Sequence, residues 1–131
     1  MSNSPPAQLI YLSNKGSRMA ILLNTLAMER STYVVTVSFA DENGAAVVPS
    51  SAAWTLTDGG GAVVNSRQDV TLAPLAAAKQ IVLSGNDLAL ASNQPEWRIL
   101  TVAAAYTSSL GADLPLNEEV RFLVAPLAGV A

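Results

Sequence analysis

The chain has 131 residues, which suits a single domain, and its 10 acidic and 7 basic residues give a net charge of −3. It contains no cysteine and no histidine, so disulfides, thiolate or imidazole ligands for zinc, and nucleophilic devices built on Ser-His or Cys-His pairs are excluded. Basic residues do not cluster, and binding of nucleic acid through its phosphates is therefore not expected.

Residues 1–28 are predicted to form an N-terminal arm outside the domain. The segment is largely polar and includes Pro5-Pro6 and Gly16, and a segment of this kind cannot bury enough apolar surface to fold alone. It holds one short apolar island. The island consists of Leu9, Ile10, Tyr11 and Leu12. Two interpretations stay open: a leader upstream of a natural start at Met19, or an arm that becomes ordered on a partner and is anchored by the island.

No membrane partner is expected. The most apolar N-terminal run, residues 19–28, is interrupted by Asn24 and Thr25, whereas a membrane span needs about 20 apolar residues. Residues 1–6 also lack the basic and apolar regions of a secretory signal peptide. The pattern therefore predicts a protein that is made and kept in a cytoplasm, at least until assembly or lysis.

Residues 29–131 are predicted to form one β domain, and residues 32–40 are its clearest strand. Apolar and polar side chains alternate along it, as they do in a strand with one buried face. Asn43-Gly44 then predicts a hairpin turn, since both residues tolerate positive φ. A second alternating strand is centred on Trp54, and Gly59-Gly60-Gly61 ends it in a flexible turn.

The remaining elements follow in chain order. They are weak strands at 69–72 and 80–83, a one-turn helix at 84–90 capped by Ser84 or Asn86, a strand at 97–106, a loop at 107–117 and a last strand at 118–125. Residues 97–106 are apolar on both faces, which predicts a central strand covered on both sides.

The predicted fold class is all-β. About seven or eight strands, with a turn roughly every 8 to 12 residues, predict an immunoglobulin-like antiparallel β-sandwich with an extended N-terminal arm. Trp54 takes the place of the core tryptophan of that fold, although the cysteine pair of antibody domains is absent. The predicted core residues are Tyr33, Val35, Val37, Phe39, Trp54, Leu56, Leu100, Val102, Val120, Phe122 and Val124.

Few side chains could carry catalysis or hold a metal. The carboxylate pairs Asp41/Glu42 and Glu118/Glu119 suit a turn and the start of a strand. Calcium needs six or more oxygen ligands, and a loop site built from Asp41, Asn43 and Asp58 is too sparse to provide them. We therefore expect no enzymatic activity, no cofactor and no metal.

Trp97 has two open interpretations. It lies beside Pro95 and Arg98, where it either covers the end of a strand or contacts a partner. Aromatic side chains are enriched in protein interfaces because they supply a large contact area. The candidate partner-binding residues are therefore Trp97 and the apolar island of the arm.

Five segments carry a resemblance to a known group of proteins. They are 33–44 (YVVTVSFADENG), 48–59 (VPSSAAWTLTDG), 63–65 (VVN), 98–106 (RILTVAAAY) and 114–122 (LPLNEEVRF). Together they resemble small immunoglobulin-like proteins encoded among the structural genes of tailed bacteriophages. The resemblance covers about residues 30–125, and strand alternation and turns make up most of its motifs.

The resemblance implies a virion component without enzymatic activity. The first expectation is a capsid decoration protein that binds the capsid lattice, and the alternative is a neck or tail accessory protein. Its partners would be other virion proteins, with further copies of itself as a homo-oligomer in the assembly. It would be made in the host cytoplasm and reside in the virion. The rival readings are a bacterial immunoglobulin-like module for binding or adhesion, which the missing signal peptide disfavours, and an enzyme or small-ligand carrier.

Overall fold

Strands make up nearly all of the regular structure in the computed structural model, which describes residues 7–12 and 21–129 and the side chains of 22–129. The strands are β1 (Ala7–Leu12), β2 (Ile21–Leu22), β3 (Ala27–Met28), β4 (Thr32–Phe39), β5 (Ser51–Asp58), β6 (Val70–Thr71), β7 (Ala78–Ser84), β8 (Glu96–Ser108) and β9 (Gly111–Ala125). One short 3₁₀ turn, η1 (Gly85–Leu88), follows β7. The predicted all-β class is confirmed, and the expected one-turn helix after Ser84 is present as η1.

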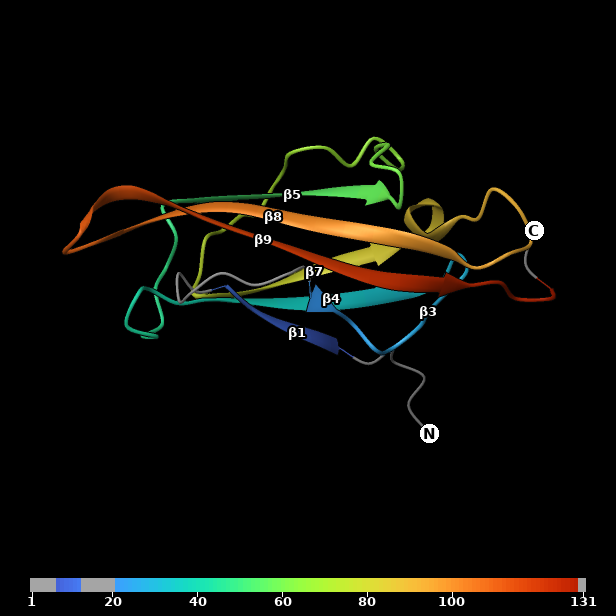
Figure 1. Ribbon diagram of the computed structural model, residues 1–131, viewed down its shortest axis with the longest axis horizontal. Coiled ribbons are helices and arrows are strands. Elements are labelled where there is room, and N and C mark those ends of the chain that lie inside the picture. Colours follow the sequence, from blue (N-terminus) through green and yellow to red (C-terminus); the bar gives the residue numbers. More distant parts are fainter. Residues whose placement is uncertain (1–6, 13–20, 130–131) are drawn as a thin grey trace.

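The strands form two sheets. The smaller sheet has the order β1-β4-β7, and the larger sheet has the order β2-β9-β8-β5-β6, with β3 also paired to β9. Figure 1 shows β5, β8 and β9 side by side in one layer and β1, β4 and β7 in the other.

The sheets are mixed, which corrects the expectation of a purely antiparallel arrangement. β1 runs parallel to β4, and β2 and β3 run parallel to β9, whereas all other pairs are antiparallel. Only a short hairpin connection forces two strands to be antiparallel. The strands of the arm are separated from their partners by long stretches of chain, so the sequence pattern did not determine their direction.

Alternating burial along the long strands places the core between the two sheets. Every predicted core residue is buried, and Tyr33 of β4 stacks on Phe122 of β9 with ring centroids 4.6 Å apart. The Tyr33 hydroxyl donates a hydrogen bond to the Thr25 carbonyl oxygen at 2.7 Å, and burial raises the pKa of Tyr33 to about 12. The core also contains Leu23, Ala27, Leu72, Ile81, Leu83, Leu88, Ala104, Tyr106 and Leu116.

The β8–β9 hairpin is longer than predicted. Residues 107–117 were expected to form a loop, but β8 continues to Ser108 and β9 begins at Gly111. Pro115 is tolerated because β9 pairs there with Ala105 of β8 on one side, and no described strand pairs with it at that level on the other side. β8 is central in its sheet, as predicted, but its outward face is covered only in part, since Ile99 is buried there whereas Trp97 and Ala103 are exposed.

Candidate interaction surface

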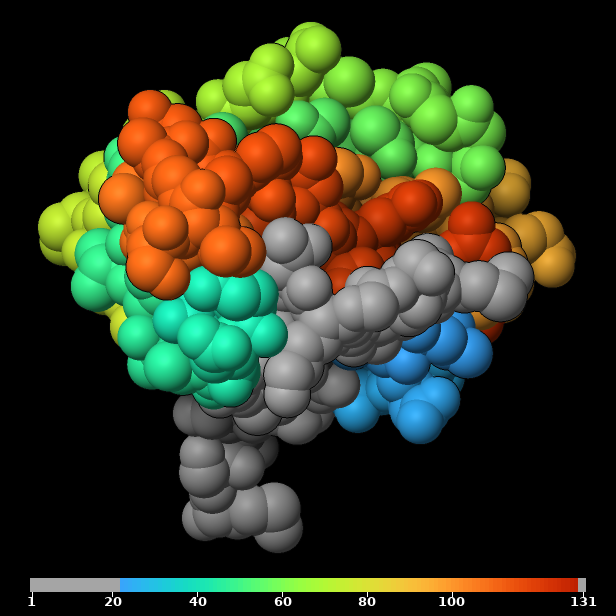
Figure 2. All heavy atoms as spheres, turned by 60° about the vertical axis from the view of Figure 1, so that its left-hand side comes forward, coloured from blue at the N-terminus to red at the C-terminus, as the bar shows by residue number. Residues whose placement is uncertain are grey.

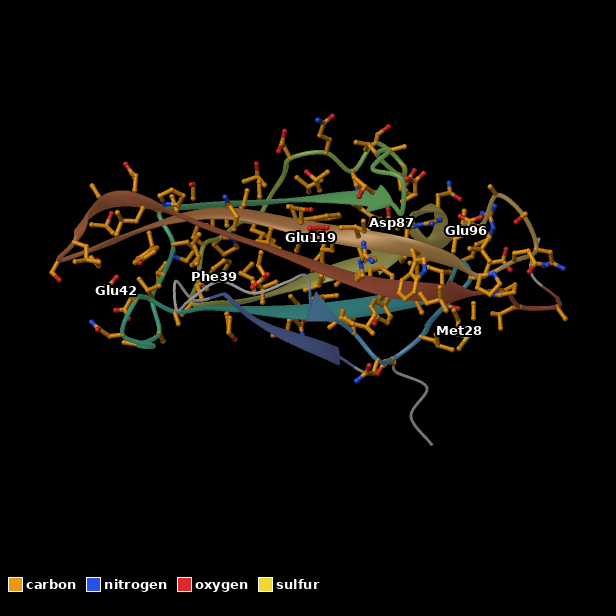
Figure 3. All side chains as sticks on the ribbon, viewed as in Figure 1. Met28, Phe39, Glu42, Asp87, Glu96 and Glu119 are labelled. Atoms are coloured by element: carbon orange, nitrogen blue, oxygen red, sulfur yellow. The ribbon has the colours of Figure 1, made fainter. Side chains whose placement is uncertain are left out.

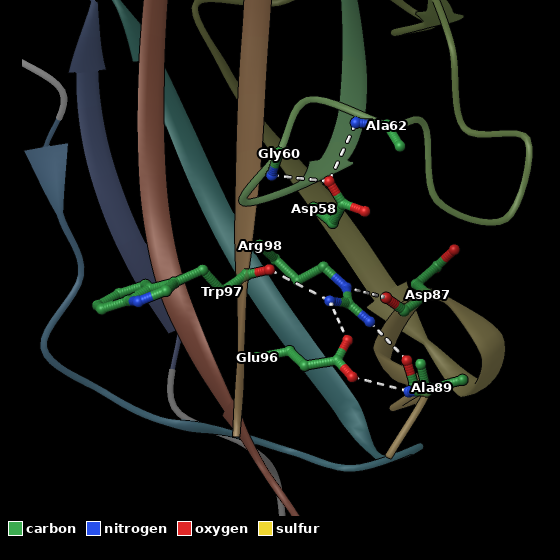
Figure 4. Close-up of polar contacts among 9 residues, drawn as sticks. Asp58, Gly60, Ala62, Asp87, Ala89, Glu96, Trp97 and Arg98 are labelled. Carbon is green, nitrogen blue, oxygen red and sulfur yellow. Dashed lines mark hydrogen bonds and ion pairs between the residues drawn. The ribbon is translucent and has the colours of Figure 1, made fainter. Parts of the chain in front are cut away.

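Trp97 lies on the face of the larger sheet that points away from the core. Its side chain leaves β8 on the side opposite to Arg98, as Figure 4 shows, and 42% of Trp97 is exposed. Leu123 of β9 stands opposite it in the strand register. The guanidinium carbon of Arg121 lies 5.9 Å from the centroid of the Trp97 ring, within the range of a cation–π contact. Trp97 is thus held by its neighbours yet open to a partner.

The surface around Trp97, called the outer face here, has few charges. Side chains alternate between the two faces of a strand. The residues that lie between the core-facing positions of β5, β8 and β9 therefore point outward and form the outer face. It consists of Ala53, Thr55 and Thr57 of β5, Trp97, Ile99, Thr101 and Ala103 of β8, and Asn117, Glu119, Arg121 and Leu123 of β9. Glu119 and Arg121 are its two charged members, and Glu119 is labelled near the middle of the molecule in Figure 3.

Side-chain size changes along the outer face. Trp97 and Leu123 are large and lie at one end, whereas Ala53 and Ala103 are small and lie at the other. At the small end the surface is hollowed into an open groove of about 320 Å³. The groove is lined by Ser50, Ser51, Ala52, Ala53, Thr71, Leu72, Leu75 and Ala103. It carries no charged side chain, so an apolar group suits it best.

A second candidate is the polar cluster around Asp87, on the loop that contains η1. The fully buried Asp87 carboxylate accepts hydrogen bonds from Arg67 Nε at 2.8 Å and Asn65 Nδ2 at 2.9 Å through Oδ1. Its Oδ2 accepts one from the backbone N–H of Ser84 at 3.0 Å. Burial by itself would raise the pKa of Asp87, but the hydrogen bonds from Arg67, Asn65 and Ser84 outweigh it and hold that pKa below its ordinary value.

Arg98 lies beside this cluster and is also buried (Figure 4). Its guanidinium donates to the carbonyl oxygens of Asp87, Ala89 and Trp97 and to the carboxylate of Glu96. The other oxygen of Glu96 accepts from the backbone N–H of Ala91 at 2.8 Å. All three nitrogens of Arg98 are therefore engaged within the chain. The cluster fixes the loop that contains η1 onto β8, and we assign it a structural role.

This cluster was not predicted from the sequence, although one signal was present. Ser84 and Asp87 stand three residues apart, the spacing of a capping box in which the third residue's carboxylate binds the backbone at the start of the turn. The contacts of Asp87 with Arg67 and Asn65 join separate loops and leave no local pattern.

The structure does not bring the predicted partner-binding residues together. Leu9, Ile10, Tyr11 and Leu12 belong to β1 in the smaller sheet, opposite residues 36–39 of β4, whereas Trp97 lies in the larger sheet. In the structure β1 therefore pairs with its own chain. Ordering of the arm on a neighbouring subunit stays a prediction, and Met19 lies outside the described residues.

The acidic residues weighed as calcium ligands bind the backbone of their turns, as expected for Asp41. Asp41 Oδ1 accepts the backbone N–H groups of Asn43 and Ala45, and Asp58 Oδ1 accepts those of Gly60 and Ala62. Among the described residues, no three Asp, Glu, His or Cys side chains gather closely enough to hold a metal ion. Glu42 binds the Tyr106 hydroxyl at 2.8 Å and the Ser108 hydroxyl at 3.1 Å.

Glu42 thereby ties the 41–45 turn to the tip of the β8–β9 hairpin. Figure 2 shows these two segments, teal and orange, in contact at one end of the molecule.

In the part of the chain that the structure describes, no helix is long and apolar enough to cross a membrane. A scan against models of protein families found no match, and no curated protein matches the chain in sequence.

Proposed function

We propose that the chain is a non-enzymatic structural module that binds other proteins through the outer face of its larger sheet. The observation that carries this proposal is the exposure of Trp97 on a face with only two charges, Glu119 and Arg121. Tryptophan is enriched among the residues that dominate binding energy in interfaces, and charged residues are depleted at interface centres.

The fold we propose for this module is an immunoglobulin-like sandwich. Its support is the order of pairing: β4 and β7 pair in one sheet, while β5, β8 and β9 pair in the other. An immunoglobulin domain divides its B and E strands from its C, F and G strands in the same way. Trp54 on β5 is buried, at the position of the core tryptophan of strand C.

The setting we propose is the virion of a tailed phage, with capsid decoration ahead of a neck or tail position. Its support is the resemblance of residues 30–125 to small immunoglobulin-like virion proteins, together with an outer face that a protein lattice could cover. Neighbouring genes test the setting first. Portal and capsid genes beside this gene are expected, whereas secretion or surface-anchoring genes would contradict it.

Binding to the parent particle tests the role of the outer face. Trp97→Ala should lower the number of copies retained per particle, because it removes the largest exposed contact of that face. Val82→Ala is the matched control, since Val82 is an exposed apolar residue, 52% accessible, on the smaller sheet. Cryo-electron microscopy of the particle then gives the location. Wild-type occupancy by Trp97→Ala, or density in which Trp97 faces solvent, would overturn the proposal.

A further inference from the structure

In the strand register, paired residues of β5, β8 and β9 stand side by side in rows across the sheet, and each such row is called a level here. Leu56, Leu100 and Val120 stand side by side on the core side of the sheet and define the middle level. One residue to either side of it, Arg121 stands beside Ile99 and Glu119 beside Thr101. Arg121 and Glu119 therefore lie at equal distances from the middle level, in opposite directions.

The same relation holds further out. Trp97 precedes Leu100 by three residues and Ala103 follows it by three, so the largest side chain and the groove floor also lie at equal distances from the middle level. When the face is turned end over end along its strands, the large Trp97 therefore takes the place of the small Ala103. The positively charged Arg121 likewise takes the place of the negatively charged Glu119. A surface with this property is complementary to itself, which is what an isologous two-fold contact requires.

We infer that two copies of the chain bind each other face to face through their outer faces, about a two-fold axis that crosses the strands at the level of Leu100 and Val120. In this arrangement Arg121 of each copy meets Glu119 of the other, and Trp97 of each copy enters the groove at Ala103 of the other. The inference rests on the proposed function and names a second copy as a partner of that same face.

Charge selects this axis over the other two-fold choice. An axis parallel to the strands and centred on β9 would place Arg121 against Arg121 and Glu119 against Glu119, whereas one centred on β8 would place them against Thr57 and Thr55 and leave both charges without an opposite charge. Like charges that face each other across an interface cost several kcal/mol, whereas opposite charges fix the register. The two charged pairs also lie nearest the perpendicular axis, so they stay in contact when the twisted sheets cross at about 30°.

The size of the face sets the expected strength. Three strands at about 4.8 Å spacing and seven residues at about 3.3 Å rise cover on the order of 300 Å² per copy. A standard interface buries about 800 Å² per partner, so the dimer is expected to be weak and dependent on concentration. Attachment of both copies to one assembly would strengthen the contact through their effective concentration.

Sedimentation velocity of the purified full chain tests the dimer directly. Between about 10 µM and about 0.5 mM, a range suited to a small interface, the mean mass should rise from one chain towards two. One chain has a mass of 13.6 kDa. A mean mass that stays at one chain over this whole range would overturn the inference.

Charge reversal tests the geometry. Glu119→Arg and Arg121→Glu should each weaken association at least about tenfold, because each creates two like-charge contacts about the axis. The double variant Glu119→Arg/Arg121→Glu should return to within about threefold of the wild type, since both opposite-charge contacts are restored. A double variant as weak as the single variants would overturn the arrangement. Unchanged far-UV spectra and melting temperatures confirm that all three variants fold.

Filling the groove gives an independent test. Ala103→Trp should abolish the dimer because it occupies the place of the partner's Trp97, whereas Val82→Trp on the smaller sheet should leave it unchanged.

Particle binding separates the two proposals. Retained particle binding by a chain that stays monomeric refutes the dimer alone. If the dimer forms, but neither its disruption nor Trp97→Ala lowers particle occupancy, the proposed function alone is refuted.

Discussion

Asp87 shows how one buried charge organises a surface loop. Its carboxylate is fully buried, and its partner Arg67 is 41% exposed, so the pair lies at the edge of the core. The folded protein holds the pKa of Asp87 below its ordinary value. The unfolded chain therefore binds a proton more readily at this site than the folded chain does, and the carboxylate stabilises the fold wherever it is ionised.

The first prediction concerns acid stability. The contribution of Asp87 should be fully present above about pH 4, the ordinary range of an aspartate, and be lost as the pH falls through its lowered folded value. Asp87→Asn should cost about 1–3 kcal/mol at pH 7, because Arg67 and Ser84 lose a charged acceptor. Urea unfolding from pH 7 to pH 3 measures both effects. A variant that loses stability with acid as steeply as the wild type would contradict this assignment.

Two aspartates build turns with the same geometry. Asp41 and Asp58 each begin an Asp-x-x-Gly-Ala segment, and in both the side chain binds the N–H groups two and four residues later. The glycines have φ values of 80° at Gly44 and 92° at Gly61, the left-handed region that other residues avoid. Both turns were predicted from their glycines, and hydrogen bonding of Asp41 to the backbone of its turn was also expected and is confirmed, whereas the same role of Asp58 was not predicted.

The second prediction follows from this shared geometry. Asp41→Ala and Asp58→Ala should each cost about 1–2 kcal/mol, because each leaves two backbone N–H groups without their acceptor in a turn that water reaches. Asp41→Asn and Asp58→Asn are the matched controls, since an amide oxygen can accept the same bonds, and should cost less. Chemical denaturation compares the four variants. Equal losses for Ala and Asn at either site would show that the acceptor is not what stabilises that turn.

At the scale of elements, local patterns predicted strands well and pairing poorly. Residues 32–40 were predicted as a strand and β4 spans Thr32–Phe39, because alternation and a following turn are local signals. The hairpin extension beyond Tyr106 was missed because Gly111 and Pro115 are also typical of loops. The parallel pairing of β2 and β3 with β9 was missed because very short strands carry no periodicity.

The third prediction tests what the arm strands contribute. Leu23 and Ala27 are buried in the core, and Thr25 accepts the Tyr33 hydroxyl. Deletion of residues 2–18 should leave the domain cooperatively folded, since these core contacts remain. Deletion of 2–28 should cost several kcal/mol, because loss of one buried leucine alone costs about 2–5 kcal/mol. The sequence-based prediction that residues 1–28 lie outside the domain implies, by contrast, that both truncated chains keep the fold.

Leu23→Ala in the full chain is the matched control for the arm. It should cost about 2–4 kcal/mol, a large part of the loss in the longer deletion, with β1, β2 and β3 still present. Urea unfolding compares the three proteins. Equal stability of the two truncated chains would mean that residues 21–28 do not belong to the folding unit.

At the scale of the whole molecule, one of the two tryptophans lies in the core and the other lies on the outer face. Trp54 of β5 is 6% exposed and packs in the core, while Trp97 of β8 is 42% exposed on the outer face. The burial of Trp54 could be predicted from the sequence because its neighbours alternate regularly. The environment of Trp97 stayed open, since the local pattern cannot show whether another part of the chain covers a side chain.

The last prediction contrasts these two residues. Trp54→Ala should cost about 3–5 kcal/mol, because it leaves a large cavity between the sheets. A domain of this kind has only about 5–15 kcal/mol of stability, so such a loss should shift its urea midpoint strongly. Trp97→Ala should change stability by about 1 kcal/mol or less, since its side chain lies outside the core and is 42% exposed, so its loss leaves no cavity between the sheets. Circular dichroism follows both variants without depending on tryptophan fluorescence. A large loss of stability in Trp97→Ala would mean that this tryptophan supports the fold itself, and that its exposure does not mark a binding surface.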